Sequence, residues 1–437
     1  MAQCETDMTH SVTDLSYARA PMRRAAPDLW ATVDAFLLVV VFATSSDMLI
    51  QVGGLQSPVW MLCYLLALLR IATLWPYFLT VLQRNKLIFA FPVVALSSVL
   101  WSVSPVDTLV LSLQLFMTVL IAAYLGWRYS LFALTKALAV VLSAAAVLSL
   151  LHWATGIFPW PVHAPAGGLM GIYSQKNMLG QRMLFATIAI LTLWLMPQSR
   201  MRAGAKRAFI LPLFLVLFAL VLSKSVTTML LLPMALGMWL VLLRRYVPAA
   251  ITVPVFLAGA LLLAIVPLLL GANGIDPIEA TLDAFGKSST LTGRTLIWDV
   301  ALGVIAEHPI LGVGYRAFWL APQFANGQMA IVDAGAVTSR SFHNFVLEIL
   351  VSAGWPGLIA MFALLGVTLL RLWQLFTDFH SVEAGGAIVQ VVFSVGLSLL
   401  GTSLFRGHEI MLIMVVAFMV SSQEDRIARQ IDLRGFG

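Results

Sequence analysis

Runs of about 20 apolar residues recur along most of this chain, and they restrict its fold more than any other feature of the sequence. A helix of that length crosses the hydrocarbon core of a bilayer and satisfies its backbone hydrogen bonds internally. The runs are continuously apolar and do not alternate with period two, which excludes a transmembrane β-barrel. Only 11% of the residues are charged, compared with roughly 25% in soluble domains. The sequence therefore predicts an all-α, polytopic membrane protein.

The apolar runs predict about twelve transmembrane helices within a membrane domain of residues 31–422. The two tails, 1–30 and 423–437, are polar. One long polar loop, 271–343, interrupts the domain and is expected to contain short helices. The predicted spans are residues 31–50, 58–74, 87–101, 106–126, 137–155, 177–197, 208–222, 226–243, 249–270, 354–374, 387–404 and 409–422.

The distribution of Lys and Arg predicts the orientation of these helices. With the N-terminus in the cytoplasm, 18 of the 26 basic residues fall on the cytoplasmic side, four near short external connections and four in the long loop. Because long loops contribute little to the positive-inside rule, this asymmetry predicts that both termini are cytoplasmic and that the loop 271–343 is external. The same rule explains the net charge of +6, so no nucleic acid is expected as a partner.

Two external cations lie at one predicted span. Lys176 is at its outer mouth, and Arg182 follows six residues later, about 9 Å deeper in a helix. A cation at that depth requires an anionic ligand, a wet cavity or an ion pair, for which Asp34 and Asp47 are the candidate partners. Lys176 could instead be an interfacial lysine that reaches the lipid headgroups.

Two further external turns each carry a cation. Lys224 precedes the span 226–243, where the Ser225 hydroxyl is expected to cap the next helix. Arg406 precedes the last span and could pair with Glu409. Turn formation and capping explain the neighbouring polar residues but not cations on this side, so both are candidate ligands of an anionic substrate.

The long loop contains two candidate arginines and a candidate base. From Arg294 the sequence predicts an amphipathic helix with Trp298 on the same face. Such a helix could be an interfacial anchor, or its free N–H groups and Arg294 could bind a phosphate. Arg316 follows a Gly-x-Gly segment, 312–314, which predicts turns because no strand precedes it. His343 lies where the loop re-enters the membrane and could accept a proton from a sugar hydroxyl or form an interfacial hydrogen bond.

No metal or cofactor is expected. The sequence contains no Asp-x-Asp pair, no Gly-x-Ser-x-Gly nucleophile turn and no His/Cys spacing typical of a metal site. Asp276, Glu279 and Asp283 could share a helical face, but a solvated surface explains them better. The remaining chemistry is therefore that of lysine, arginine and one well-placed histidine.

In their order along the chain, these motifs resemble the O-antigen ligase and Wzy-type polysaccharide polymerase superfamily, especially exopolysaccharide polymerases of the succinoglycan type. The resemblance covers roughly residues 30–420. The motifs that carry it are Trp101-Ser102-Val103-Ser104-Pro105, Gln175-Lys176-Asn177-Met178-Leu179-Gly180, Ser223-Lys224-Ser225, Thr292-Gly293-Arg294 with Trp298, His308-Pro309 with Gly312-x-Gly314, and His343-Asn344 with Leu347-Glu348.

The resemblance implies a GT-C-like helical membrane fold and metal-independent transfer of a glycan from undecaprenyl diphosphate to an acceptor hydroxyl at the periplasmic face. The family's essential loop arginine matches Arg294, and its essential histidine matches His343. A further membrane-proximal arginine of the family has several candidate matches. We therefore predict Arg294 and His343 as catalytic residues and the other external cations as ligands of the donor diphosphate: Lys176, Arg182, Arg316, Lys224 and Arg406.

The predicted function is polymerisation of undecaprenyl-diphosphate-linked oligosaccharide repeat units into exopolysaccharide at the periplasmic face of the bacterial inner membrane. The alternatives are an O-antigen ligase that transfers polymer to lipid A–core, and a transporter or flippase. A carrier built from two six-helix halves would place its long connection inside the cell, whereas here the long loop is external. The expected partners are the lipid-linked oligosaccharide, a glycan acceptor, the lipid bilayer, a chain-length regulator and export proteins.

Overall fold

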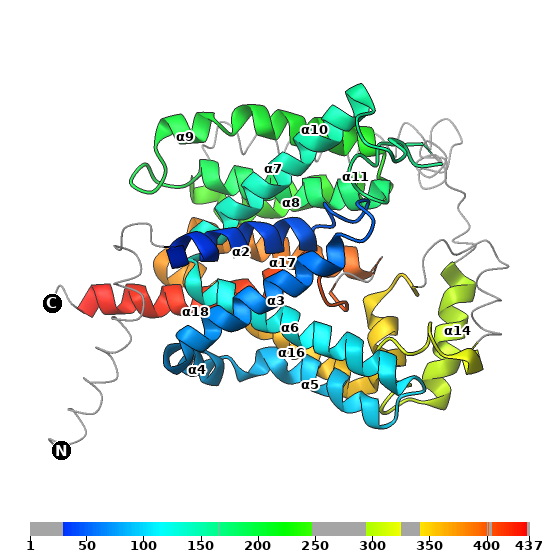
Figure 1. Ribbon diagram of the computed structural model, residues 1–437. Helices are drawn as coiled ribbons and strands as arrows, with labels where there is room; N and C mark the ends of the chain where they lie inside the picture. The colour runs from blue at the N-terminus through cyan, green and yellow to red at the C-terminus, as the bar shows by residue number, and fades with distance from the viewer. Residues whose placement is uncertain are drawn as a thin grey trace, which may run out of the picture.

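The computed structural model describes residues 29–165, 167–246, 294–324, 341–399, 401 and 404–434, and within these ranges it contains helices and no β-strand (Figure 1). The helices are α2 (Leu29–Ser45), α3 (Gln56–Thr73), α4 (Trp75–Arg84), α5 (Ala90–Ser97), α6 (Pro105–Arg128), α7 (Leu131–Thr155), α8 (Lys176–Trp194), α9 (Ala203–Arg207), α10 (Ile210–Ser223), α11 (Val226–Leu243), α14 (Arg294–Glu307), α16 (Phe345–Phe379), α17 (Val382–Leu399) and α18 (Ile410–Arg434).

Among the described residues, seven helices are long and apolar enough to cross a membrane, or eight if the bent pair Trp75–Arg84 and Lys86–Leu100 is one broken span. The prediction of a polytopic helical membrane protein is therefore confirmed. Helices α2, α8 and α18 cover three further predicted spans, whereas 249–270 lies outside the described residues. The count of twelve stays a prediction. The predicted tail 423–437 begins within α18, which continues to Arg434.

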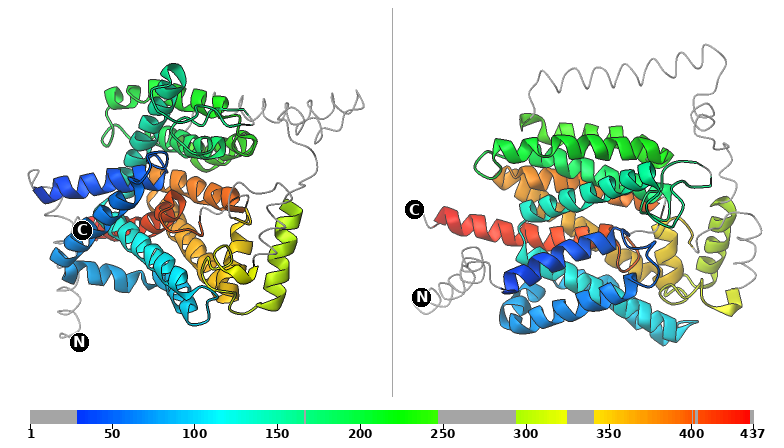
Figure 2. Two further views of the ribbon diagram at one scale, coloured as in Figure 1. Left: turned by 45° about the vertical axis from the view of Figure 1, so that its right-hand side comes forward. Right: turned by 45° about the horizontal axis from the view of Figure 1, so that its top comes forward.

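Helix α18 runs through the centre of the bundle. Its residues from Ile410 to Val420 are all buried, and it packs against α6, α7, α16 and α17. Helices α7, α8, α10 and α11 lie on one side of it, and α5, α6 and α16 lie on the other (Figures 1 and 2). Helix α6 approaches closely because Gly126 has no side chain: a Cβ there would lie 2.5 Å from the Ala417 oxygen.

The bundle has two ends, which we name after their short helices. At the α9 end, α2 begins and α18 finishes, while α14 lies at the opposite, α14 end (Figures 1 and 2). Near the α9 end the buried Asp34 carboxylate accepts from Arg70 Nε at 2.8 Å, Arg128 Nε at 2.9 Å and the Tyr124 hydroxyl at 2.6 Å. This cluster joins α2, α3 and α6, because the buried Asp34 carboxylate on α2 is stabilised by cations from the other two helices.

Helix α16 is broken at Gly354, near the α14 end. Gly354 has φ 56° and ψ −157°, and a Cβ there would lie 1.9 Å from the backbone oxygen of Ile310. Trp355 N donates to that oxygen at 3.2 Å, so the preceding loop satisfies the backbone exposed by the break. The predicted span 354–374 lies within this helix, which extends beyond it at both ends. The helix begins at Phe345, because Gly354 interrupts it rather than preceding it.

Candidate active site

Arg182 on α8 is buried, and two carboxylates neutralise its charge. Its Nη2 lies 3.0 Å from Asp47 Oδ2 and 3.2 Å from Glu409 Oε2. A charge removed from water requires such partners. Of the two candidate partners, Asp47 is the one that Arg182 binds, whereas Asp34 belongs to the cluster near the α9 end. Since its charge is already compensated, Arg182 is a weak candidate for direct binding of a substrate anion.

Arg316, in the loop between α14 and α16, is a partly buried cation that, unlike Arg182, has no described carboxylate partner. Its guanidinium forms no hydrogen bond or ion pair with any residue that the structure describes, and only its backbone N–H is bound, to Ser352 Oγ at 3.2 Å. Burial lowers the pKa of Arg316, the nearby charge of Arg406 lowers it further, and Glu348 and Glu409 oppose this effect. Two neighbouring guanidinium groups, one without a described ion-pair partner, would be stabilised by an anion.

His408 lies in the turn before α18, next to this pair. Its ring stacks on Trp60, with 4.2 Å between centroids and 14° between planes, and it forms a hydrogen bond with the Tyr64 hydroxyl. Its backbone N–H donates to Thr118 Oγ1 at 3.0 Å. Burial lowers the pKa of His408 to about 4, and the charge of Arg316 contributes to this shift. His408 is therefore neutral near pH 7 and is not poised to titrate there.

The segment around His343 is fixed by hydrogen bonds on both sides. His343 N donates to Ser341 Oγ at 2.9 Å, and Phe342 N donates to Glu348 Oε1 at 2.8 Å. Asn344 caps α16 by accepting from the N–H two positions further on at 2.9 Å. His343 itself has φ 53°, a conformation uncommon for a residue with a Cβ. As predicted, His343 lies where the loop meets the next helix.

Helix α14 is attached directly to this segment. The predicted helix from Arg294 is confirmed, and Trp298, one turn later, donates its indole N–H to the Phe342 oxygen at 3.0 Å. Arg294 therefore begins a helix that is tied to the residue before His343; the Arg294 side chain lies outside the described part of the structure. The same contact rests on a small apolar core formed by Ile297, Ala301, Val304, Val313, Phe318, Trp319, Phe342 and Val351.

Lys176 and Lys224 lie on adjoining turns. The Ser225 hydroxyl, beside Lys224, donates to Asn177 Oδ1 at 3.0 Å and lies 3.0 Å from Thr228 Oγ1. The prediction that this hydroxyl caps α11 is wrong, because Ser225 Oγ accepts no hydrogen bond from a backbone N–H of α11. Lys176 is half-buried at the first position of α8, and Lys224 is exposed with φ 49°. Both belong to the turns that join α8 to the α10–α11 hairpin.

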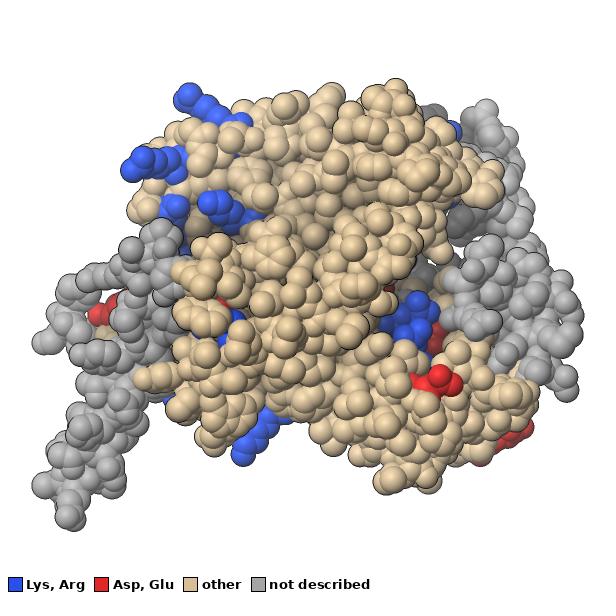
Figure 3. Space-filling model, viewed as in Figure 1, with Lys and Arg blue, Asp and Glu red and all other residues tan. Residues whose placement is uncertain are grey.

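Charged side chains gather at both ends of the molecule. Figure 3 shows basic groups on the surface of the α9 end and, at the opposite end, basic atoms in a hollow with acidic atoms beside them. Arg182, Arg316, Arg406 and Glu409 interact electrostatically at that opposite end. The recessed, mixed charge there fits a site for an anionic group.

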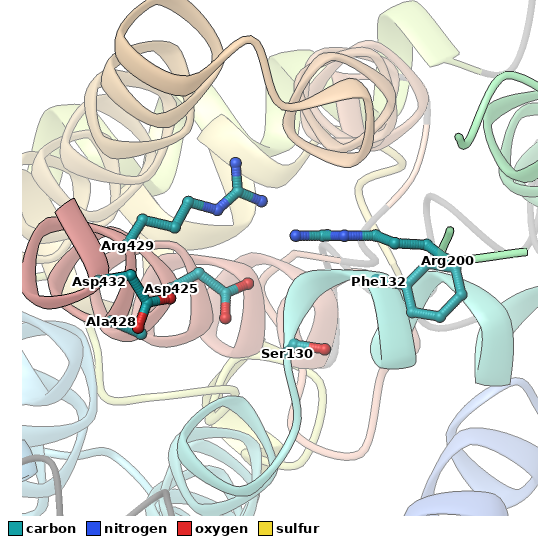
Figure 4. Close-up of a pocket in the computed structure, with 7 residues that line it drawn as sticks. All are labelled: Ser130, Phe132, Arg200, Asp425, Ala428, Arg429 and Asp432. Carbon is teal, nitrogen blue, oxygen red and sulfur yellow. The ribbon is translucent and has the colours of Figure 1, made fainter. Parts of the chain in front are cut away.

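A separate cavity of about 330 Å³ lies at the α9 end (Figure 4). Arg200 Nη1 and Arg429 Nη2 point toward each other across it and donate to the same Glu383 Oε1, at 2.6 and 2.7 Å. Asp425 on its wall is about 25 Å from His408 along α18, so this cavity is not part of the site around His343. Its lining residues are Ser130, Phe132, Arg200, Asp425, Ala428, Arg429 and Asp432.

Sequence reasoning missed the acidic part of the site. It predicted neither Glu409 as the partner of Arg182 nor Glu348 as a neighbour of Arg316 and Arg406. A signal was present, because an acidic residue at the edge of an apolar span requires a polar or charged partner. Gly354 gave the corresponding signal for the break in α16, since glycine is favoured where φ is positive.

Comparison with known proteins supports the resemblance seen in the sequence. Residues 211–362 match a family model described as O-antigen ligase. The chain is 27% identical over 279 residues to the exopolysaccharide production protein ExoQ of Rhizobium meliloti (strain 1021). That alignment covers 63% of this chain and 62% of the relative, so less than two thirds of the relative's length is matched. The resemblance to O-antigen ligases and Wzy-type exopolysaccharide polymerases is therefore confirmed. The family match includes Lys224, Arg294, Arg316 and His343 but not Lys176, Arg182 or Arg406.

Proposed function

We propose that this relative of O-antigen ligases and Wzy-type polymerases joins undecaprenyl-diphosphate-linked oligosaccharide repeat units into exopolysaccharide. The reaction would take place at the periplasmic face of the inner membrane, with both termini in the cytoplasm. A polytopic helical membrane protein whose α14 end carries recessed cations suits a substrate that has a lipid tail and an anionic headgroup. Metal independence is carried over from the family resemblance.

One observation carries this proposal. The Arg316 guanidinium has no described hydrogen bond or ion pair, and it lies close enough to Arg406 for the charge of Arg406 to lower the pKa of Arg316. Two like charges held together in a partly buried site favour binding of an anion, although Glu348 and Glu409 offset part of their charge. A diphosphate supplies that anion and accepts several hydrogen bonds from guanidinium groups. Of the five predicted ligands, we therefore assign the diphosphate first to Arg316 and Arg406. Lys176 and Lys224 are candidate ligands for more external parts of the donor.

Arg182 has an indirect role in this scheme. It holds the carboxylate of Glu409, which itself interacts with Arg316. Without Arg182, the buried Asp47 and the half-buried Glu409 would lack their described cationic partner. Arg182 therefore shapes the anion site instead of binding the donor.

In the proposed transfer step, His343 is the base and the arginines stabilise the leaving group. The acceptor hydroxyl oxygen forms a bond to the anomeric carbon of the donor, while the bond from that carbon to the diphosphate oxygen breaks. The hydroxyl proton passes to His343, and the electron pair of the broken bond leaves with undecaprenyl diphosphate. Arg316, Arg406 and Arg294 stabilise the negative charge that develops on the leaving group.

An O-antigen ligase is the second candidate, because the matching family model carries that description. Ligase and polymerase use the same type of donor and differ in the acceptor: lipid A–core for the ligase, another repeat unit for the polymerase. A flippase is a weaker alternative, since transport alone would not need a His343 segment fixed by hydrogen bonds beside a helix that begins with Arg294.

Deleting the gene and analysing the surface glycans distinguishes these functions. A polymerase deletion leaves single repeat units on the carrier lipid and no long polymer. A ligase deletion leaves long polymer on the carrier and unsubstituted core, and a flippase deletion leaves precursor on the cytoplasmic side. Either of the last two results would overturn our proposal. A plasmid-borne wild-type copy should restore the polymer, as should Arg202→Ala, which changes an exposed arginine at the α9 end.

A further inference from the structure

Glu348 lies in the first turn of α16 and is 3% exposed. Its Oε1 accepts the backbone N–H of Phe342 at 2.8 Å, directly before His343. The same carboxylate interacts electrostatically with Arg406 and Arg316. One buried acid thus accepts a hydrogen bond from the segment that carries the candidate base and lies within electrostatic range of the two cations of the candidate anion site.

Two kinds of neighbouring group stabilise the buried carboxylate of Glu348. A buried carboxylate is stabilised by donors, which the Phe342 N–H provides, and by nearby positive charge, which Arg406 and Arg316 provide. Removing the charge alone affects only the interaction with Arg406 and Arg316, because a glutamine can still accept the hydrogen bond from Phe342. Replacing the whole side chain affects both.

We propose that Glu348 is a positioning residue for glycan transfer: it holds the His343 segment through Phe342 and balances the charge of Arg316 and Arg406 until the donor diphosphate takes over that balance. This inference rests on the proposed function. The diphosphate and the carboxylate of Glu348 repel each other while both attract the same guanidinium groups. Glu348 therefore weakens binding of the diphosphate, including the product that must leave after each transfer.

Two variants separate these roles. Glu348→Gln keeps the acceptor for Phe342 and removes the charge, so the purified protein should bind inorganic pyrophosphate, without divalent metal, about tenfold more tightly than wild type. Its polymer yield in the deletion strain should fall less than that of Glu348→Ala, because the hydrogen bond from Phe342 remains. Glu348→Ala removes charge and acceptor, so pyrophosphate binding should again be tighter while polymer falls by about tenfold or more because the His343 segment is released.

Asp299→Asn is the matched control, because it removes one negative charge from an exposed position on α14 without touching the segment. It should change neither the pyrophosphate affinity nor the polymer. Size-exclusion profiles of the purified variants report whether each one folds. Glu348→Gln preserves the shape of the side chain and the hydrogen bond, so the test can be decided with this variant if Glu348→Ala is unstable.

An unchanged or weaker pyrophosphate affinity of Glu348→Gln would overturn the inference, as would an equal loss of polymer in both variants. Failure of the proposed function gives a different result, in which the wild-type gene does not restore polymer to the deletion strain. The binding comparison needs neither donor nor acceptor glycan, so it decides the role of Glu348 in either case.

Discussion

Trp298 donates its indole N–H to the backbone oxygen of Phe342 at 3.0 Å, and this bond attaches α14 to the residue before His343. Phe342 is also bound from the other side, because its N–H donates to Glu348 at 2.8 Å. The two candidate catalytic residues, Arg294 and His343, are 49 positions apart in the sequence but belong to segments that this hydrogen bond joins. The geometry of the proposed reaction therefore depends on Phe342 being held.

Replacing Trp298 with phenylalanine tests this dependence. The ring keeps most of the apolar contact, whereas the hydrogen bond to the Phe342 oxygen is lost, a net change of about 1 kcal/mol. We expect polymer production to fall by about five- to tenfold without loss of protein from the membrane, because a small misplacement of reacting groups slows catalysis. Polymer yield, normalised to protein measured by immunoblot, checks this. Wild-type yield would show that the attachment of α14 is not needed.

Arg316→Ala should abolish polymer formation without harming the fold. Removing a preorganised donor to a developing negative charge typically slows a reaction by about 100-fold or more. The variant loses no described ion pair, so its melting temperature in detergent should equal or exceed that of wild type. Thermal unfolding and polymer yield are measured on the same protein preparations. A clear drop in melting temperature would instead make Arg316 a structural residue.

Arg182→Ala should give the opposite combination. It leaves the buried Asp47 and the half-buried Glu409 without this partner, and breaking a buried ion pair in this way costs about 3–5 kcal/mol. We expect a strongly lowered melting temperature and little folded protein. The triple variant with Asp47→Asn and Glu409→Gln should recover much of the stability, because it removes all three charges. Normal stability of Arg182→Ala would contradict the ion-pair assignment.

Much of the fold could be predicted because apolar runs, caps and charge asymmetry act locally in the sequence. The helix beginning at Arg294 was predicted, and Asp47 was one of the two partners proposed for Arg182. The break at Gly354 was not, because it depends on the loop residue Ile310, 44 positions earlier, whose oxygen occupies the space where a side chain would be. Such long-range steric contacts leave no periodic pattern in the sequence.

The candidate site was predictable only in part for a similar reason. Cations on the external side violate the positive-inside rule, and this drew attention to Arg182 and Arg406. Acids have no such rule: Glu409 was considered only as a partner of Arg406, and Glu348 was not recognised as an electrostatic neighbour of either cation. Which cation is compensated and which is open to an anion depends on tertiary pairing. For that reason the sequence could not rank Arg316 above Arg182.

The pH dependence of stability should contain a contribution from His408. In the folded protein, burial and Arg316 lower the pKa of His408 from 6.5 to about 4, so the unfolded chain binds a proton more readily between these values. The contribution of His408 to the free energy of unfolding is complete above pH 6.5. It is lost as the pH falls toward 4, by at most about 1.4 kcal/mol per pH unit. Thermal unfolding of wild type and His408→Asn over this range measures it. The curves should converge as the pH falls, whereas the exposed His308→Asn control should run parallel to wild type.

A pair of glycine substitutions within α16 tests whether the break at Gly354 is a required feature of the fold. Gly354→Ala places a Cβ 1.9 Å from the Ile310 oxygen and forces an alanine into φ 56°, so we expect a loss of at least about 2 kcal/mol of stability. Gly366→Ala, on the same helix, meets nothing within 4 Å and should stabilise the protein by up to about 1 kcal/mol. Melting temperatures of both variants show whether the break is required.

Because the segment 310–314 packs in the break and leads to Arg316, Gly354→Ala should also weaken pyrophosphate binding, and Gly366→Ala should not. Equal behaviour of the two variants would mean that α16 tolerates a regular helix at this position.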